Sequence, residues 1–205
     1  VPVLLEAEWE EGGIDDLSEF WATRGYAVPI DRGRVAAGLT DQQGLMNINA
    51  LSFPGDVQRA EFARLFGRLG LPAATLDAID AFLSGGGPPQ PGAYLSRPLP
   101  VQPTGGPVRL VEELRQVEGL GPSAYARLAP FVSALPPEVY TVNVNTAPPE
   151  VLAALLPDVG ADGLRAILAD RSRKPYASAV DFRARATELV GEEALEMVQV
   201  GRFVA

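Results

Sequence analysis

The clearest pattern of apolar and polar positions lies at residues 140–156, where an alternating strand runs directly into a helix. Valines at even positions alternate with Asn143 and Asn145, which predicts a strand with the valines on one face and the asparagines on the other. Thr146 follows and suits a helix cap, because its oxygen can accept from free backbone N–H groups. Apolar residues then recur at helical spacing: Val151, Leu152, Leu155 and Leu156.

A fainter copy of this strand lies at residues 45–51 and carries Asn47 and Asn49 at the same spacing. Two asparagines on one strand face usually bind neighbouring backbone and so anchor the turn into the next helix. We therefore interpret both asparagine pairs as parts of the architecture, and the chain between the two copies as an insertion.

Helical periodicity dominates that insertion. Apolar stripes on either side of the break at residues 70–72 predict a helical hairpin that begins near residue 57. Residues 84–107 are rich in glycine and proline and predict a long loop. A second helical pair follows, and its turn contains Gly119 and Gly121.

The two ends of the chain carry the remaining strand signals. A short helix is expected near residues 14–23, followed by strands at 26–30 and 34–39 around the turn-forming Asp31-Arg32-Gly33. Residues 197–204 also alternate, and we expect that strand to rejoin the sheet formed by the first part of the chain. These patterns together predict an α+β fold.

Composition removes several classes of function. The chain has 205 residues, a formal charge of −9, and neither cysteine nor histidine. Thiol and histidine catalysis, disulfides and ordinary zinc sites are therefore excluded. Lys174 is the only lysine, whereas a protein that binds phosphate backbones normally shows a basic face, so nucleic acid is not an expected partner. No apolar run approaches the roughly 20 residues of a membrane span.

Two further patterns leave alternatives open. Asp77 and Asp80 are three residues apart on one helix, so their carboxylates could reach one cation, although a solvated helix face explains them more simply. The glycines at Gly119 and Gly121 could present backbone N–H groups to a phosphate or let two helices pack closely. No basic residue follows before Arg127, so we favour close packing.

Several segments, in this order, resemble one known family. They are residues 41–51, 77–80, 113–119, 135–136 and 142–147. Their order and spacing resemble general secretion pathway protein K, the large minor pseudopilin of the bacterial type II secretion system, over roughly residues 30–185.

The resemblance implies a pilin-like body with a small antiparallel sheet and an inserted helical domain of the SAM-like or helix-hairpin-helix-like kind. The corresponding division is a first part of the body at 1–52, the insert at 53–137, and a return to the body at 138–205, with further short helices. It also implies an N-terminal membrane helix, missing from this sequence, which would anchor a periplasmic protein in the inner membrane.

The implied role is not enzymatic. Such a protein would cap and nucleate the tip of the pseudopilus with the I and J minor pseudopilins and support export of folded proteins across the outer membrane. Its further expected partners are other pseudopilins and secreted cargo. Calcium is the one cofactor that the resemblance brings in, with Asp77 and Asp80 as the candidate ligands in this sequence.

A second hypothesis belongs to a different class. Residues 143–147 and the helices that follow also resemble the helix-hairpin-helix module of DNA-uptake proteins. That module needs a glycine hairpin with nearby lysines, whereas Asp158 and Asp162 flank Gly160 here and place carboxylates where a phosphate would approach. The DNA hypothesis also leaves the first 140 residues unexplained.

Overall fold

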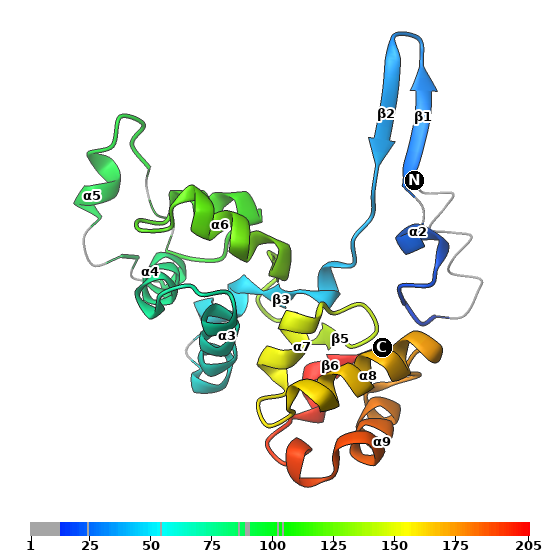
Figure 1. Cartoon of the computed structure of the whole chain (residues 1–205). Helices are drawn as coiled ribbons and strands as arrows, with labels where there is room; N and C mark the ends of the chain where they lie inside the picture. Colours follow the sequence, from blue (N-terminus) through cyan, green and yellow to red (C-terminus); the bar gives the residue numbers. More distant parts are fainter. Residues whose placement is uncertain are drawn as a thin grey trace.

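The computed structural model describes residues 13–23, 25–53, 55–85, 87–88, 91–101, 103 and 105–205. The fold is mixed α+β, with helices and three small sheets. A short helix, α2 (Phe20–Thr23), leads into a hairpin of β1 (Tyr26–Ile30) and β2 (Gly33–Ala37). Figure 1 shows this hairpin projecting from two helical lobes.

The first lobe begins and ends with a short strand. Its elements are β3 (Met46–Asn47), the 3-10 helix η2 (Ile48–Ser52), α3 (Asp56–Arg68), α4 (Ala73–Leu83), α5 (Gly92–Leu95), η3 (Val111–Gln116), α6 (Pro122–Leu128), η4 (Ala129–Phe131) and β4 (Val132–Ser133). Its core forms where the apolar stripes of these helices meet, and Leu65, Ile79, Leu114 and Leu128 are fully buried there. The predicted loop at 84–107 contains one helical turn, α5.

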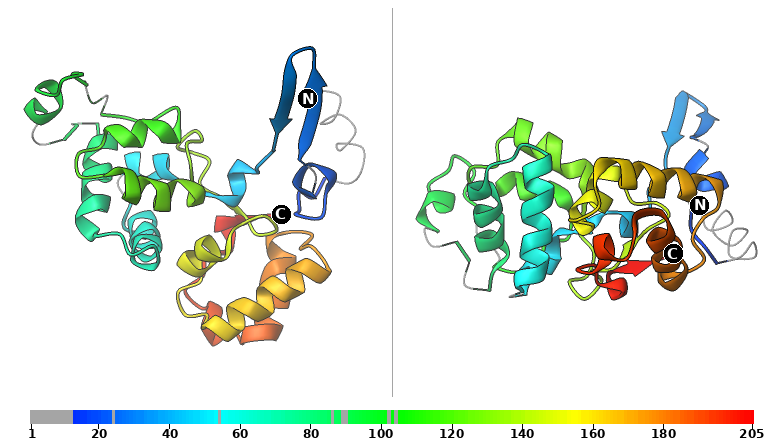
Figure 2. Two further views of the ribbon diagram at one scale, coloured as in Figure 1. Left: turned by 45° about the horizontal axis from the view of Figure 1, so that its top comes forward. Right: turned by 60° about the horizontal axis from the view of Figure 1, so that its bottom comes forward.

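The second lobe has the same plan in fewer residues. It consists of β5 (Val142–Asn143), α7 (Pro149–Leu155), α8 (Ala161–Arg173), α9 (Ala179–Val190), η5 (Glu193–Leu195), η6 (Val200–Arg202) and β6 (Phe203–Val204). Aromatic rings fill its core: Phe182 lies 5.1 Å from Tyr176 and 4.9 Å from Phe203 between ring centroids. Both views in Figure 2 show α8 and α9 side by side.

The sheet pairing corrects one prediction. The hairpin strands β1 and β2 form where the sequence predicted them, but they pair only with each other, whereas β3 pairs with β4 and β5 with β6, both in parallel. The prediction that the C-terminal strand rejoins the N-terminal sheet is therefore wrong for the described residues. Phe203 of β6 is instead buried against Phe182 in the core of the second lobe.

One buried asparagine side chain organises each lobe. In the first lobe Asn49 Oδ1 accepts from the N–H of Val108 at 2.8 Å, while its Nδ2 donates to the carbonyls of Val108 and Leu135 at 2.8 and 2.9 Å. In the second lobe Asn145 Oδ1 accepts from the N–H of Tyr176 at 2.8 Å, and Nδ2 donates to its carbonyl at 3.0 Å. Each amide thus satisfies the backbone of a distant segment that is buried away from water.

The other asparagine of each pair ends the first strand of its lobe. The side-chain oxygens of Asn47 and Asn143 accept from the backbone N–H two residues later, at 3.1 and 2.9 Å. Their strands pair in the same register with the closing strands, Asn47 opposite Ser133 and Asn143 opposite Val204. The two lobes are therefore built to one design.

Helix α3 joins the two lobes. Arg64 donates from Nε to the carbonyl of Ala154 in α7 at 2.6 Å. Arg202, near the C-terminus, donates from Nε and Nη2 to the two oxygens of Glu61 at 3.1 and 2.7 Å, and the two side chains are only 7% and 6% exposed. This bidentate pair is buried, so removing either side chain would leave an uncompensated charge in the interior.

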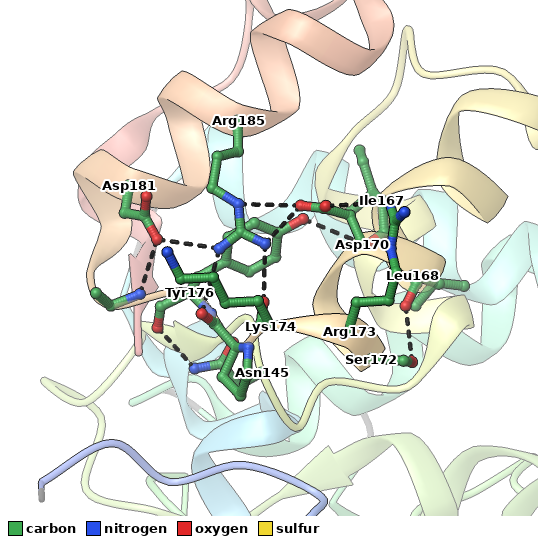
Figure 3. Close-up of polar contacts among 12 residues, drawn as sticks. Asn145, Ile167, Leu168, Asp170, Ser172, Arg173, Lys174, Tyr176, Asp181 and Arg185 are labelled. Carbon is green, nitrogen blue, oxygen red and sulfur yellow. Dashed lines mark hydrogen bonds and ion pairs between the residues drawn. The ribbon is translucent and has the colours of Figure 1, made fainter.

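A second arginine fixes the turn between α8 and α9, as Figure 3 shows. Arg185 lies over the ring of Tyr176 at 4.3 Å and pairs with Asp170 and Asp181, while Nη2 donates to the carbonyl of Lys174 at 2.8 Å. Burial raises the pKa of Tyr176 to about 12, and the nearby charge of Asp170 adds to that rise. Asn145 and Arg185 therefore both bind the backbone of the turn between α8 and α9.

We expect Asn145→Asp to lower the free energy of unfolding by about 3 kcal/mol, because it buries a carboxylate and removes the donor to the Tyr176 carbonyl. Urea unfolding at neutral pH measures this. The control Gln199→Glu makes the same amide-to-acid change at an exposed position and should stay within about 0.5 kcal/mol. Equal effects of the two variants would contradict the role assigned to Asn145.

We expect Arg202→Leu alone to cost about 3–5 kcal/mol, since it leaves the buried Glu61 carboxylate unpaired. Adding Glu61→Leu should restore most of that loss, because no buried charge then remains. A double-mutant cycle by urea unfolding tests this. The control Arg59→Leu on the same helix breaks the two solvent-accessible pairs with Asp77 and Asp80 and should cost less than about 1 kcal/mol. If the losses in unfolding free energy of the two single leucine variants simply add in the double variant, the two side chains do not compensate each other's buried charge.

Candidate functional site

The projecting hairpin has one apolar face. Val28 lies directly opposite Val35 and Ile30 opposite Gly33, and strand alternation puts Pro29 and Arg34 on the other side. The side chains of Val28, Ile30 and Val35 are 59%, 56% and 51% exposed. A two-stranded hairpin has no core of its own and is at best marginally stable alone, so this apolar hairpin face is a candidate contact surface.

Three more large apolar side chains near the hairpin in sequence are also exposed. Leu17, Phe20 and Leu39, which lie on either side of the hairpin in sequence, are 50%, 41% and 37% exposed. Large exposed apolar patches mark interaction sites on soluble proteins more often than isolated exposed residues do. The chemistry available here is therefore apolar burial against another polypeptide.

Asp41 ties the base of the hairpin to the second lobe. Its carboxylate accepts from the N–H of Gln43 at 2.8 Å, from Nδ2 of Asn143 at 3.0 Å, and from the hydroxyl of Thr146 at 2.6 Å. A side chain at Gly44 could not fit, because a Cβ there would lie 2.5 Å from Thr146 Oγ1. Asn143 and Thr146, chosen from the sequence as structural residues, thus meet at this junction.

The same junction also holds the segment before α2. Asn143 donates from Nδ2 to the backbone carbonyl of Asp15 at 3.1 Å. Burial raises the pKa of the Asp15 carboxyl, and the charges of Glu19, Asp41 and Asp16 raise it further. The sequence offers no local signal for this role of Asp41, because its partners Asn143 and Thr146 lie 102 and 105 residues away.

The candidate metal ligands Asp77 and Asp80 lie on α4, and both pair with Arg59 of α3. Calcium takes six to eight oxygen ligands, whereas a guanidinium occupies these two carboxylates. Across the described ranges, no group of three or more acidic, histidine or cysteine side chains is arranged to hold a metal ion. In this structure Arg59 binds both carboxylates, and a role of Asp77 and Asp80 as calcium ligands stays a prediction.

The glycines at the turn before α6 serve backbone conformation. Gly119 has φ +84°, which favours glycine, and Gly121 precedes the first residue of α6. A Cβ at either position would meet nothing within 4 Å, so the close helix packing favoured from the sequence is not what these glycines provide. Arg115 lies over the ring of Tyr125 at 4.3 Å beside the same turn.

Comparison with known families identifies the chain. Two family models, both described as type II secretion system protein K, match residues 44–137 and 142–200. The chain belongs to the type II secretion system protein K family. The boundary between the two matches falls between the two lobes, so each protein K model covers one lobe.

Individual protein K relatives agree with this assignment. The proteins of Klebsiella pneumoniae and Aeromonas hydrophila are 34% and 31% identical, over 69% and 85% of this chain. The chain spans 49% and 60% of the length of those relatives. Its fold matches a solved structure, the GspK-GspI-GspJ complex of enterotoxigenic Escherichia coli, with TM-score 0.76 and 24% identity over 98% of this chain and 75% of that one.

Within the described part of the chain, no helix combines the length and the apolar character needed to cross a membrane.

We expect Thr146→Val to loosen the hairpin base, because it removes a short hydrogen bond to a carboxylate without changing side-chain shape. Hydrogen exchange of the amides at 26–37 should become faster, with a loss in global unfolding free energy of only about 1–2 kcal/mol. Thr187→Val is the control, since the Thr187 hydroxyl makes no hydrogen bond to another described residue. Unchanged exchange in the hairpin would refute the anchoring role.

Proposed function

We propose that this chain is part of a minor pseudopilin that caps and nucleates the tip of the type II secretion pseudopilus together with the I and J minor pseudopilins. It has no enzymatic role and supports export of folded proteins across the outer membrane. Membership in the protein K family directs the proposal. The observation that carries it is the apolar hairpin face, which the surface of another subunit would cover.

The described residues leave the apolar hairpin face exposed to solvent. Val28, Ile30 and Val35 remain exposed even though all the described residues are present around them. Packing another subunit on this face would remove three aliphatic side chains from water. Each would contribute about half of the roughly 1.5–3 kcal/mol gained by burying such a side chain from full exposure, because each is already about half buried. The structural neighbour is a GspK chain solved in complex with GspI and GspJ, which supports partners of the same classes here.

We also propose the domain arrangement implied by the family. Residues 1–52 contribute the first part of a pilin-like body, 53–137 form the helical insert, and 138–205 return to the body. The Asp41 junction supports this arrangement, because it binds the hairpin base to the beginning of the second lobe. The protein would act in the periplasm, anchored in the inner membrane by an N-terminal helix.

The experiment mixes this domain with the soluble domains of its cognate I and J pseudopilins and measures mass by light scattering after size exclusion. The variant Val28→Glu with Val35→Glu should abolish the ternary peak, because it places two charges on the apolar hairpin face. Its matched control, Ala27→Glu with Ala36→Glu, makes the same change at the adjacent cross-strand pair on the opposite face and should keep the complex.

A parallel run with duplex DNA at low salt tests the helix-hairpin-helix hypothesis. Separate protein peaks together with a salt-sensitive DNA shift would overturn the pseudopilin proposal. Loss of the complex in both hairpin variants would retain the function but reject the apolar hairpin face as the contact surface.

A further inference from the structure

A cavity of about 380 Å³ lies between the segment before α2 and the end of α8. One part of its wall comes from residues 16–18, and another from residues 171–173 and Pro175. Asn145 also belongs to the lining, but its side-chain amide already binds the backbone of Tyr176. None of the side chains of the apolar hairpin face lines this cavity, so the two are separate surfaces.

Arg171 has a pair of donors that the fold does not use. Its Nη1 donates to the carbonyls of Val144 and Ala147 at 2.8 and 2.7 Å, while Nε and Nη2 bind no described residue. In the described part of the chain, the only buried arginine nitrogen without a partner is Nη1 of Arg202. The two unused nitrogens of Arg171 are therefore open to solvent, and Arg171 lines the cavity.

Two other arginines near the second lobe's core show what this edge of a guanidinium binds. Nε and Nη2 of Arg202 bind the carboxylate of Glu61, and the same two nitrogens of Arg185 bind Asp170 at 3.0 and 2.6 Å. The spacing of these donors matches a carboxylate approaching side-on. Among the described residues, no carboxylate occupies this edge of Arg171.

The positive charge of Arg171 is partly removed from water without an acid to balance it. Burial lowers the pKa of its guanidinium. Tyr176 opposes this effect, but Tyr176 is uncharged at neutral pH because its own pKa is about 12. Carbonyl groups accept hydrogen bonds but carry no full negative charge, so a carboxylate at the free edge would offset the cost of desolvation.

The remaining wall residues define the size and charge of the ligand. Arg173 adds a second positive charge, and Asp16 is the one acid in the lining, so the wall carries one net positive charge in a chain whose formal charge is −9. A single carboxylate balances that charge, whereas a doubly charged phosphate would exceed it. Leu17 and Pro175 offer apolar contacts to the methylene groups of an acidic side chain.

We propose that this cavity binds the side chain of a glutamate from another polypeptide, whose carboxylate lies side-on against Nε and Nη2 of Arg171. Arg173 adds attraction at longer range, and Leu17 contacts the methylene groups. The cavity lies where the segment before α2 meets the second lobe, so the bound acid contacts both and holds them together.

Selective ¹⁵N-arginine labelling gives a direct test, because the Nε–H signal of Arg171 reports on this edge. Arg185 and Arg202, whose Nε groups already bind carboxylates, are internal references. The probes are acetyl-alanyl-glutamyl-alanine amide, its glutaminyl counterpart, and acetyl-trialanine with a free C-terminal carboxylate. We expect the glutamyl peptide to cause a saturable shift of Arg171 alone, and the glutaminyl peptide to bind at least about tenfold more weakly.

Two exposed arginines of α8 form a matched pair of variants, since each pairs with the acid three residues before it. Arg173→Gln removes a charge from the wall and should weaken peptide binding by about threefold, whereas Arg165→Gln lies outside the lining and should leave it unchanged. Arg171→Lys keeps the charge but lacks the side-on edge, and should abolish binding while the reference signals of Arg185 and Arg202 stay in place.

Three results would overturn the proposal. The first is the absence of a saturable shift of Arg171, which would show that solvent alone satisfies its free edge. The second is equal binding of the glutaminyl peptide, or tighter binding of the free C-terminus, which would exclude a glutamate side chain as the ligand. The third is an equal effect of the Arg173→Gln and Arg165→Gln variants, which would place the peptide outside this cavity.

Discussion

A buried primary amide that binds both the N–H and the C=O of one distant residue is the interaction on which each lobe depends. Asn49 does this for Val108, and Asn145 does it for Tyr176. No other uncharged side chain of this size offers both a donor and an acceptor at this spacing except glutamine, which is one carbon longer. The helices can pack because the irregular backbone between them is satisfied at these points.

Arginine plays the corresponding part at the junctions between elements. Arg185 binds Asp170, Asp181 and the end of α8, and Arg171 donates from Nη1 to the carbonyls of Val144 and Ala147 at 2.8 and 2.7 Å. Arg202 links the C-terminal segment to α3. A planar guanidinium can bridge several acceptors in fixed directions, which an ammonium cannot, and this explains the use of arginine in a chain with a single lysine.

The sequence predicted the local features well and the distant ones poorly. The hairpin around residues 31–33 and the helices after Val57 follow from turn chemistry and periodicity. The predicted Asn-x-Asn strands are only two residues long: β3 ends at Asn47 and β5 at Asn143, and Asn49 lies in the 3-10 helix η2. The closing strands β4 and β6 have two residues each, too few to show a period, and their parallel partners lie far away in sequence. The Asp41 junction, the Glu61–Arg202 pair and the exposure of the hairpin depend on such long-range neighbours, so only the structure reveals them.

The parallel pairing of first and last strands sets the order in which the chain can fold as it is synthesised. The first lobe has its closing strand by Ser133 and the carbonyl groups that Asn49 and Asn47 bind by Val139, so it can complete its pairing while the second is still being made. The second lobe cannot close before Phe203 and Val204 have left the ribosome, and until then Asn143 lacks its strand partner. Joining α3 to Arg202 is therefore a late step, and the nascent chain carries an exposed, unpaired Glu61 until that moment.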